Sequence, residues 1–490
     1  MKILLAGYNL DYDLIEELKS KSGSTEDLTP ETVSAAYARI SRSPKPVDEL
    51  RRIARAEVEK ARLSNRNIVF EMGHSSIAEH AVFNIDVLGV SRLLVEEIEK
   101  FRLCSFTEKS QRYVLVDKDF VLPEEISRAG LAGLFAETIA AQNDYYQQLY
   151  QQLRPFVFEQ NKELAQNPAN QSMLEGWAKE DARYVISLAA QTQLGMTINA
   201  RNLELMLRRL AALPLAEARE YSEKLYNATK DIAPALIRYT RATDYDKFTR
   251  KNLSQKAAVI FSRSAQKKKK QKQSAVHLLH APADADATIA AALLFSTSDQ
   301  DYARCLKQAK KLLPKEKKNL FHAAFALMQS HDAALRELEN VDLHFELIVS
   351  SSCFAQLKRH RMATIITQAY DPAQGVTIPP SVRQIGQQKK FTDIIKQTDK
   401  IYTQIRKKTP EAATYILTNA HRKRALMKLN AREMYHLARL RADAHAQWDI
   451  RNLTEDMLKK AKKIMPLTLT LACGKDAFAA LHKKTFARGR

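Results

Sequence analysis

Two short segments alternate apolar and polar residues with a period of two, as half-buried β-strands do. They are residues 81–87 (Ala-Val-Phe-Asn-Ile-Asp-Val) and residues 343–349 (Leu-His-Phe-Glu-Leu-Ile-Val). A stretch with helical periodicity follows each of them, at residues 91–101 and 352–361. The pattern therefore predicts one strand–helix pair in each half of the chain.

Long segments rich in Ala and Leu predict helices through most of the remaining chain. The longest cover residues 131–153, 216–238 and 431–449. Only 12 of 490 residues are glycine, in keeping with a helical chain. Neither a G-x-G-x-x-G loop nor a Walker loop occurs, which argues against a Rossmann or P-loop nucleotide site. The predicted fold class is α+β in both halves.

A lysine-rich segment divides the chain. Residues 264–274 contain a single apolar residue, an alanine, beside a cluster of lysines from Lys267 to Lys272. Like charges at this density repel one another and stay solvated, so the segment predicts a linker. We therefore expect a first domain at residues 1–262, a basic linker at 263–275 and a second domain at 276–490.

Three short blocks recur in the same order in both predicted domains. Their order predicts a divergent tandem duplication. The pairs are Val33–Ser41 with Ile289–Ser296, Ile98–Ser105 with Leu357–Thr364, and Ile198–Leu203 with Leu429–Met434.

Charge is distributed unequally between the two halves. The net charge of +21 comes from −3 in residues 1–250 and +24 in residues 251–490. Such asymmetry favours a polyanionic partner, such as a nucleic acid, for the second half. The alternative is a solvated basic surface that keeps the protein soluble.

Cysteine usage and hydropathy indicate a cytoplasmic protein without a membrane segment. The four cysteines are scattered and form no CxxC pair, which argues against a disulfide framework and a zinc cluster. No window approaches the roughly 20 apolar residues that a membrane span requires. We therefore expect neither a metal centre nor membrane contact.

The tripeptide Arg359-His360-Arg361 is the strongest candidate for chemistry. It ends a predicted helix just after an alternating strand. Two guanidinium groups and an imidazole at a helix end can surround an anion, and Arg can grip a phosphate or a ring carbonyl with two hydrogen bonds. The alternative is an ordinary surface cluster in a basic domain.

Several motifs together resemble the family of flavin-dependent thymidylate synthases. Gln356–Arg361 resembles its Arg-His-Arg signature, and Phe101–Tyr113 resembles the motif that ends in Glu-x-Ser-x-Arg-Tyr. His74–His80 resembles a His-rich strand entry, and Leu440–Trp448 resembles the C-terminal signature. The resemblance covers most of both halves and implies two related, mostly helical domains, each with a small antiparallel sheet.

The resemblance also implies an activity. This family transfers a one-carbon unit from methylenetetrahydrofolate to dUMP and reduces it with hydride from FAD, with NADPH as the usual electron donor. It implies that Arg441 is catalytic, because the matching arginine promotes ionisation of the pyrimidine. The residues implied to bind the flavin are His74, Glu108, Asn199, Arg201, Arg359, His360, Arg361, Asn430 and Arg432. The residues implied to bind the nucleotide are Ser110, Gln111, Arg112, Arg183 and Gln356.

Neither repeat carries the complete set of motifs. The first has Lys100-Phe101-Arg102 in place of Arg-His-Arg, and its position for the activating arginine lies near Leu210. The second has Ala369 in place of the motif serine and an acidic residue, Asp371, near the phosphate-binding arginine's position. An acidic side chain repels phosphate, so this loss weakens nucleotide binding.

The losses are partly complementary. Because the family places its sites between subunits, the resemblance implies sites shared between the two repeats, and a homo-oligomer such as a dimer of tandem chains. One site would combine Gln356 and Arg359–Arg361 with Glu108, Ser110, Arg112, Asn199 and Arg201. The other would combine Arg441, Asn430 and Arg432 with Arg183, Lys100 and Arg102.

Several of these residues have structural alternatives. His74 and His80 can be core or cap histidines, and Arg183 can be a surface ion-pair partner. Asn199 and Asn430 can simply cap helices, a position that Asn favours.

Three functions therefore remain open. The first is thymidylate synthesis on dUMP. The second is flavin-dependent modification of another pyrimidine, perhaps in a nucleic acid, which would use the basic second half. The third is a non-catalytic descendant of the fold that serves in binding or assembly.

Overall fold

The computed structural model describes residues 1–11, 15, 17, 29–40, 43–71, 74–115, 118–263 and 274–486. The chain forms two compact units. Unit 1 contains Met1–Lys269 and Thr392–Leu417, and unit 2 contains Lys270–Phe391 and Thr418–Arg490. Most of the predicted basic linker lies outside the described residues.

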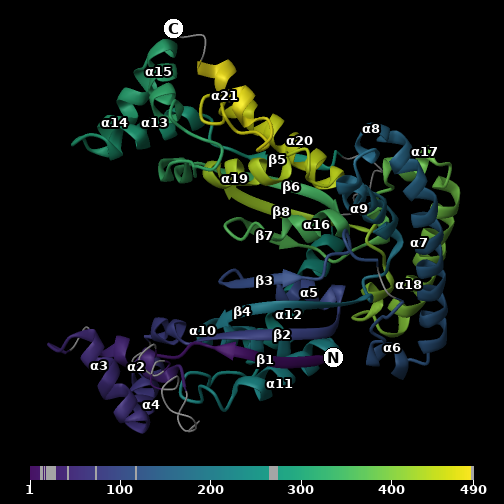
Figure 1. The fold of residues 1–490 in the computed structure, drawn as a ribbon, viewed down its shortest axis with the longest axis horizontal. Coiled ribbons are helices and arrows are strands. Elements are labelled where there is room, and N and C mark those ends of the chain that lie inside the picture. Colours follow the sequence, from purple (N-terminus) through teal and green to yellow (C-terminus); the bar gives the residue numbers. More distant parts are fainter. Residues whose placement is uncertain are drawn as a thin grey trace. The chain divides into compact units, whose positions relative to one another are not determined.

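Each unit contains one four-stranded antiparallel sheet among helices, which confirms the predicted α+β class (Figure 1). The strand orders are β1-β2-β4-β3 in unit 1 and β5-β6-β8-β7 in unit 2. The strands of unit 1 are β1 (Lys2–Tyr8), β2 (Val82–Ser91), β3 (Cys104–Glu108) and β4 (Gln191–Asn199). Those of unit 2 are β5 (Val276–His280), β6 (Asp342–Ser350), β7 (Thr364–Thr367) and β8 (Arg422–Asn430).

The two sheets repeat the same pairing. The alternating segments predicted as strands form β2 and β6, the second strand of each sheet order. Val82 of β2 lies opposite Asn199, and Asp342 of β6 lies opposite Asn430. The register of β2 shifts at Gly89, whose φ of 71° favours glycine, whereas β6 runs without that shift. The shared register supports the predicted duplication.

Helices fill the rest of both units. Those of unit 1 are α2 (Glu31–Ile40), α3 (Val47–Ala56), α4 (Val58–Arg66), α5 (Arg92–Ile98), α6 (Glu124–Arg128), α7 (Ala132–Gln160), α8 (Lys162–Ala165), α9 (Gln171–Ala182), α10 (Ala200–Ala211), α11 (Ala216–Thr229) and α12 (Asp244–Ser262). Those of unit 2 are α13 (Ala285–Ser296), α14 (Tyr302–Lys311), α15 (Pro314–Phe325), α16 (Ser351–Leu357), α17 (Pro380–Gln384), α19 (Ala431–Arg441), α20 (Trp448–Ile464) and α21 (Phe478–Phe486). Helix α18 (Gln388–Lys408) belongs mostly to unit 1.

The prediction of one helix over residues 431–449 is wrong, because α19 ends at Arg441 and a new helix, α20, begins at Trp448. The Asp443 carboxylate accepts hydrogen bonds from the backbone of His445 and Asp476, at 2.9 and 3.0 Å. Gln447 then caps α20 by accepting from the backbone N–H of Asp449 at 3.0 Å. Such side-chain contacts to the backbone compete with helical hydrogen bonds. The predicted helix over 216–238 also ends early, at Thr229.

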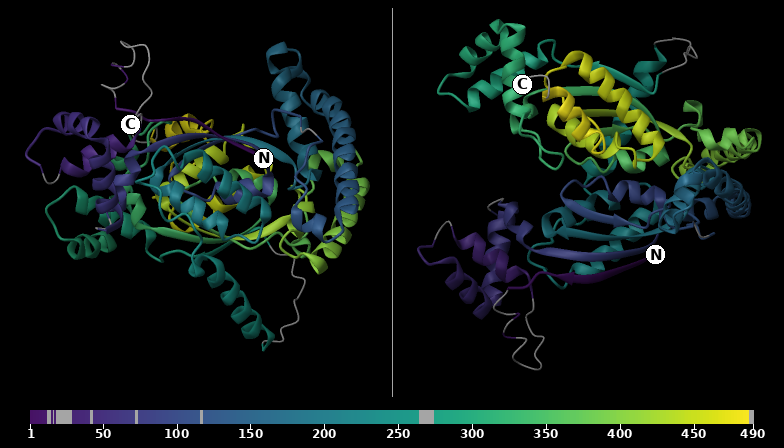
Figure 2. Two further views of the ribbon diagram at one scale, coloured as in Figure 1. Left: turned by 90° about the horizontal axis from the view of Figure 1, so that it is seen from below. Right: turned by 45° about the horizontal axis from the view of Figure 1, so that its top comes forward.

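Residues 392–417 come from the second repeat of the sequence but pack in unit 1. Helices α7 and α18 lie side by side in both figures (Figure 1, Figure 2). The buried Gln142 amide of α7 donates to the Thr398 hydroxyl at 2.8 Å and to the Ile416 carbonyl at 3.1 Å. The Tyr415 hydroxyl donates to the buried Glu217 carboxylate at 2.6 Å. Unit 1 therefore depends on both repeats.

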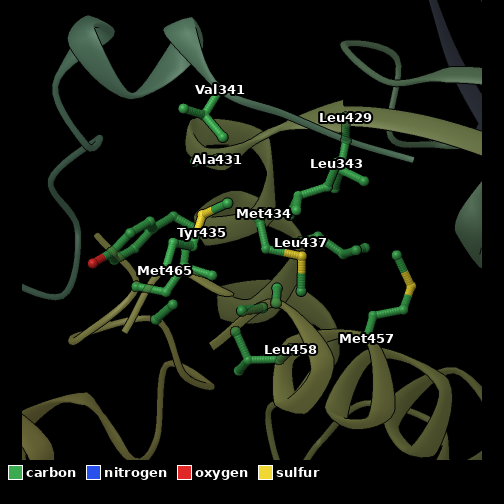
Figure 3. Close-up of a cluster of buried hydrophobic side chains, with 14 of the residues drawn as sticks. Val341, Leu343, Leu429, Ala431, Met434, Tyr435, Leu437, Met457, Leu458 and Met465 are labelled. Atoms are coloured by element: carbon green, nitrogen blue, oxygen red, sulfur yellow. The ribbon is translucent and has the colours of Figure 1, made fainter. Parts of the chain in front are cut away.

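The core of unit 2 holds α19 firmly in place. Figure 3 shows Met434 and Leu437 of α19 among apolar side chains from β6, β8 and α20. The Tyr435 hydroxyl donates to the Thr468 carbonyl at 2.9 Å. Burial of these side chains stabilises the helix by about 1.5–3 kcal/mol for each large one. The packing of α19 therefore fixes the positions of the polar residues along this helix.

Among the described residues, no helix combines the length and the apolar character needed to cross a membrane.

Candidate functional site

The Arg-His-Arg segment follows α16, which starts with a well-formed cap. The Ser350 hydroxyl accepts from the backbone N–H of Cys353 at 3.0 Å, so the strand-to-helix turn is fixed. The turn after α16 buries His360, whose exposure is 2%, and exposes both Arg359 and Arg361. The three side chains thus occupy different environments, a buried imidazole between two exposed guanidinium groups.

His360 lies between a carboxylate and a guanidinium group. Its Nδ1 is 3.1 Å from Oε1 of Glu433, and its Nε2 accepts from Nε of Arg441 at 3.1 Å. Burial lowers the pKa of His360, which favours the neutral ring. Because Arg always donates, Nε2 carries no proton and Nδ1–H donates to Glu433. We call this set of three residues the relay.

The structure corrects one sequence expectation about the relay. Complementary motif losses assign His360 and Arg441 to different sites, but a hydrogen bond joins them within unit 2. Arg441 also donates from Nη2 to the backbone carbonyl of Gln356 at 3.3 Å. The side-chain Nε2 of Gln356 is buried and has no hydrogen-bond partner among the described residues. A donor of this kind is available for an acceptor such as a ring carbonyl.

The same region holds three potential metal-binding side chains. Donor atoms of His360, Glu433 and His436 all lie within 4.8 Å of one another. A metal on Nδ1 of His360 would displace the proton that donates to Glu433, while the Arg441 guanidinium holds the other ring nitrogen. A fixed cation beside the ring opposes a second cation. The geometry therefore favours a hydrogen-bond relay over a metal centre.

Asn430 and Arg432 have structural partners in unit 2. Asn430 Oδ1 accepts from the backbone N–H of Glu433 at 2.8 Å, so Asn430 is the N-cap of α19. Arg432 donates to the Ala334 carbonyl and to the Glu339 carboxylate, both at 2.8 Å. Both residues lie at the start of the helix that ends with Arg441.

The first repeat lacks the relay. Phe101 lies as many residues after Ser91, the N-cap of α5, as His360 lies after Ser350, the N-cap of α16. By the same spacing from the caps Asn199 and Asn430, the residues of α10 that correspond to Glu433 and Arg441 are Asn202 and Leu210. Asn199 accepts from the backbone of Asn202 at 3.0 Å, so it also caps a helix.

The motif predicted to bind phosphate lies in unit 1 around Glu180. The Arg112 Nε donates to the Glu180 carboxylate at 2.6 Å, and the Ser110 hydroxyl accepts from the Arg112 backbone at 3.2 Å. Arg183 donates to the Glu180 carbonyl at 3.3 Å. It is 5% exposed, so the surface ion-pair alternative for this residue is wrong. Burial lowers the pKa of Arg183. The structure thus brings Ser110, Arg112 and Arg183 together.

The remaining predicted residues of unit 1 are dispersed along its elements. Glu108 forms an ion pair with Arg92, and both side chains are buried. Arg201 pairs with Glu79 near the start of α10. Gln111 is buried at 8% exposure, and His74 is exposed before the turn that leads into β2. The core alternative is therefore wrong for His74, which occupies the N-cap position of its turn without a side-chain hydrogen bond.

A hollow of about 240 Å³ lies on the outer face of the first sheet. Nothing lies within 4 Å of where a β-carbon on Gly195 would be, so this glycine leaves the face open. The second repeat carries Leu426 at that position. The lining of the hollow on the first sheet includes polar side chains of three strands: Asn84, Asp86, Ser105, Thr107 and Thr197. None of them was predicted as a site residue.

Comparison with known proteins decides the family. The profile of the thymidylate synthase complementing protein family matches residues 25–235 and again residues 277–467. The chain belongs to this family. The match in two regions supports the tandem arrangement, and it confirms the predicted resemblance.

This chain is similar to flavin-dependent thymidylate synthases over part of its length and to UPF0159 proteins over most of it. A flavin-dependent thymidylate synthase of Clostridium tetani is 30% identical over 216 residues, 43% of this chain and 82% of that protein. A UPF0159 protein of Chlamydia muridarum is 23% identical over 428 residues, 84% of this chain and 80% of that protein. A solved structure of flavin-dependent thymidylate synthase ThyX from Helicobacter pylori, complexed with FAD and dUMP, is 16% identical and covers 49% of this chain and 100% of that one, at a TM-score of 0.31.

The sequence did not predict the two acidic residues that contact His360 and Arg112. Glu433 and Glu180 each contact a predicted residue far away in the chain, His360 and Arg112. An acidic residue in the first turn of a helix is common, so Glu433 gave no distinct signal. Only the three-dimensional contact identifies it.

Proposed function

We propose that this protein is a flavin-dependent thymidylate synthase, which transfers a one-carbon unit from methylenetetrahydrofolate to dUMP. The hydrogen-bonded pair of His360 and Arg441 carries the proposal. A guanidinium group bonded through Nε to a buried, neutral imidazole keeps one orientation. Such a preorganised donor stabilises negative charge that develops on a pyrimidine ring.

The residues of unit 2 fit the flavin and the pyrimidine. Arg359 is exposed, and its guanidinium group forms no ion pair among the described residues, so it is available for an anion. Arg359 and Arg361 would hold FAD, which supplies the hydride that reduces the transferred carbon; NADPH would supply its electrons. The buried amide of Gln356 would donate to a ring carbonyl, and Arg441 would contact the pyrimidine edge.

The phosphate of dUMP requires the first repeat. The predicted phosphate-binding residues occur in the first repeat and not in the second: they are Ser110, Gln111, Arg112 and Arg183. Arg112 now bonds to Glu180, so phosphate binding would have to replace this contact. We therefore propose that the reaction needs residues of both repeats. His74, Glu108, Asn199, Arg201, Asn430 and Arg432 would support it by shaping the surrounding turns and caps.

The absorption spectrum of the purified protein tests this function first. We expect a yellow protein, or one that takes up added FAD, whose reduced flavin is reoxidised faster with dUMP and methylenetetrahydrofolate. A colourless protein that binds neither FAD nor dUMP would support the non-catalytic alternative instead. Light scattering on the same sample would test the proposed dimer of tandem chains, and cell fractionation would test the proposed cytoplasmic location.

A second candidate function has its own structural support. Helices α14 and α15 carry a basic face of five exposed cations, none of which forms an ion pair among the described residues. Only Lys310 of this region pairs, with Asp284 at 3.2 Å. The face consists of Arg304, Lys307, Lys311, Lys315 and Lys318. Such a surface fits a nucleic-acid backbone, so the pyrimidine could belong to a nucleic acid.

Binding to RNA at several salt concentrations separates the two candidates. Binding through this face would weaken steeply as salt rises, because counterions are released on association. Replacing Lys307, Lys311 and Lys315 by Gln would reduce the slope. Binding that is absent, or independent of salt, would leave dUMP as the acceptor.

A further inference from the structure

Glu433 has no role in the proposed chemistry, yet it is the acidic member of the relay. Its side chain is 6% exposed, and its carboxylate lies 3.1 Å from Nδ1 of His360, whose side chain is 1% exposed. The Asn430 cap fixes the backbone N–H of Glu433, so the carboxylate lies in the first turn of α19. A negative charge is favourable there because of the helix dipole.

The relay has one direction of proton donation. Arg441 Nε–H donates to His360 Nε2, so the ring must carry its proton on Nδ1, and this proton donates to Glu433. If Glu433 did not accept, the ring could equally protonate Nε2, and Nε2–H would face the Nε–H of Arg441. Two donors would then point at each other, and Arg441 would move away.

We propose that Glu433 is a positioning residue for the pyrimidine site. It keeps His360 in the Nδ1–H form, and His360 in turn orients the guanidinium group of Arg441. This inference rests on the proposed function, because it names the residue that makes Arg441 an effective contact for the pyrimidine.

Comparison of the repeats supports this role. Asn202 takes the position of Glu433 in the first repeat, where Phe101 and Leu210 take those of His360 and Arg441. The Asn202 amide bonds to its own cap, Asn199, at 2.8 Å. All three members of the relay are thus present in one repeat and absent from the other. The carboxylate accompanies the pair that it would orient.

The first experiment reads the tautomer of His360 directly. Nitrogen-15 chemical shifts of the histidine rings distinguish a protonated from an unprotonated nitrogen, and His360→Gln identifies the signal. We expect a protonated Nδ1 and an unprotonated Nε2 in the wild-type protein. The opposite tautomer would overturn the proposal. This measurement requires no nucleotide, so it remains informative if the protein does not bind dUMP.

The second experiment compares two substitutions. Glu433→Gln keeps an oxygen acceptor, and Glu433→Leu removes it. We expect Glu433→Gln to keep the tautomer and Glu433→Leu to give a mixture with about tenfold weaker dUMP binding, as loss of a hydrogen bond at a charged group predicts. Glu455→Leu on α20, an exposed residue, is the matched control. The effect of Glu433→Leu should largely disappear in an Arg441→Ala background.

Three results would count against the positioning role. The first is additive effects of Glu433→Leu and Arg441→Ala. The second is equal losses of dUMP binding for the Gln and Leu variants. The third is stoichiometric zinc binding that needs Glu433 and His436, which would identify a metal site instead. If Glu433→Leu does not fold, the wild-type tautomer and the Gln variant still decide the matter. If no variant binds dUMP, the proposed function fails while the tautomer result stands.

Discussion

The two repeats share a fold but differ at the end of one helix. Both sheets pair their second and third strands in the same register, and both following helices start with an Asn cap. The last turn of α10 carries the buried Leu210, whereas α19 ends in Arg441, which contacts a buried histidine. The two repeats therefore share the framework, whereas the second alone carries the relay residues at these positions. The first repeat carries the motif predicted to bind a phosphate.

Removing the guanidinium group of Arg441 from the second repeat should have the largest effect on activity. We expect Arg441→Leu, which copies the residue of the first repeat, to reduce dUMP-dependent flavin oxidation by about 10²–10³-fold, as loss of a preorganised donor does. Stopped-flow absorbance would measure the rate. Arg209→Leu removes an exposed arginine next to Leu210 and should leave the rate unchanged. An Arg441→Leu protein with full activity would contradict the role of the relay.

The reverse exchange should damage stability instead. Leu210 is 2% exposed, so Leu210→Arg would bury a charge that has no prepared partner. We expect the urea midpoint of unfolding to fall by an amount equivalent to about 3–5 kcal/mol. Arg209→Leu serves again as the control and should change stability by about 0.5 kcal/mol or less. Unchanged stability of Leu210→Arg would show that the first repeat can accommodate the missing residue.

The contact between Tyr415 and Glu217 should have a smaller effect. Tyr415→Phe removes a hydroxyl that donates to a buried carboxylate at 2.6 Å, which should cost about 1–3 kcal/mol of unfolding free energy. Tyr302→Phe changes an exposed tyrosine and provides the matched control. Equal denaturation curves for the two variants would mean that the hydroxyl contributes nothing to unit 1.

The smallest effect should appear as a dependence on pH. Burial raises the pKa of Glu217 above its usual value of 4.5. A raised pKa in the folded state means that this group stabilises the fold below its usual pKa of 4.5, and that the contribution is lost as the pH rises through the folded pKa. Glu217→Gln should therefore remove part of the fall in stability above that pH. Parallel stability curves for the two proteins would contradict the shift.

The sequence predicts the strands that alternate cleanly and misses those that do not. Strand β6 alternates apolar and polar residues from Asp342 to Leu347, whereas β8 has a buried lysine, Lys423, and an exposed leucine, Leu426, so its pattern is less evident. The break between α19 and α20 was missed because Asp443 and Gln447 act through contacts to the backbone, and the segment contains neither Gly nor Pro. Hydropathy carries no record of such contacts.

Motifs identified the arginines and histidines of the site but not the acids that hold them. His360 and Arg441 stand out by resemblance to a family signature, yet their hydrogen bond spans 81 residues. Glu433 lies 73 residues from His360, and Glu180 lies 68 residues from Arg112. Such pairs become visible only once the strands and helices are placed. The site residues themselves therefore remain predictions that the proposed experiments test.

The packing of residues 392–417 in unit 1 has a consequence for how this gene can be divided. Cutting the chain between the repeats would leave residues 1–262 without the hydroxyls of Thr398 and Tyr415. Gln142 and Glu217 would then be exposed or unsatisfied in the isolated first fragment. We expect that fragment to be poorly soluble when expressed alone and to be rescued by coexpression of the second. On this expectation, the two repeats no longer correspond to two independently folding proteins.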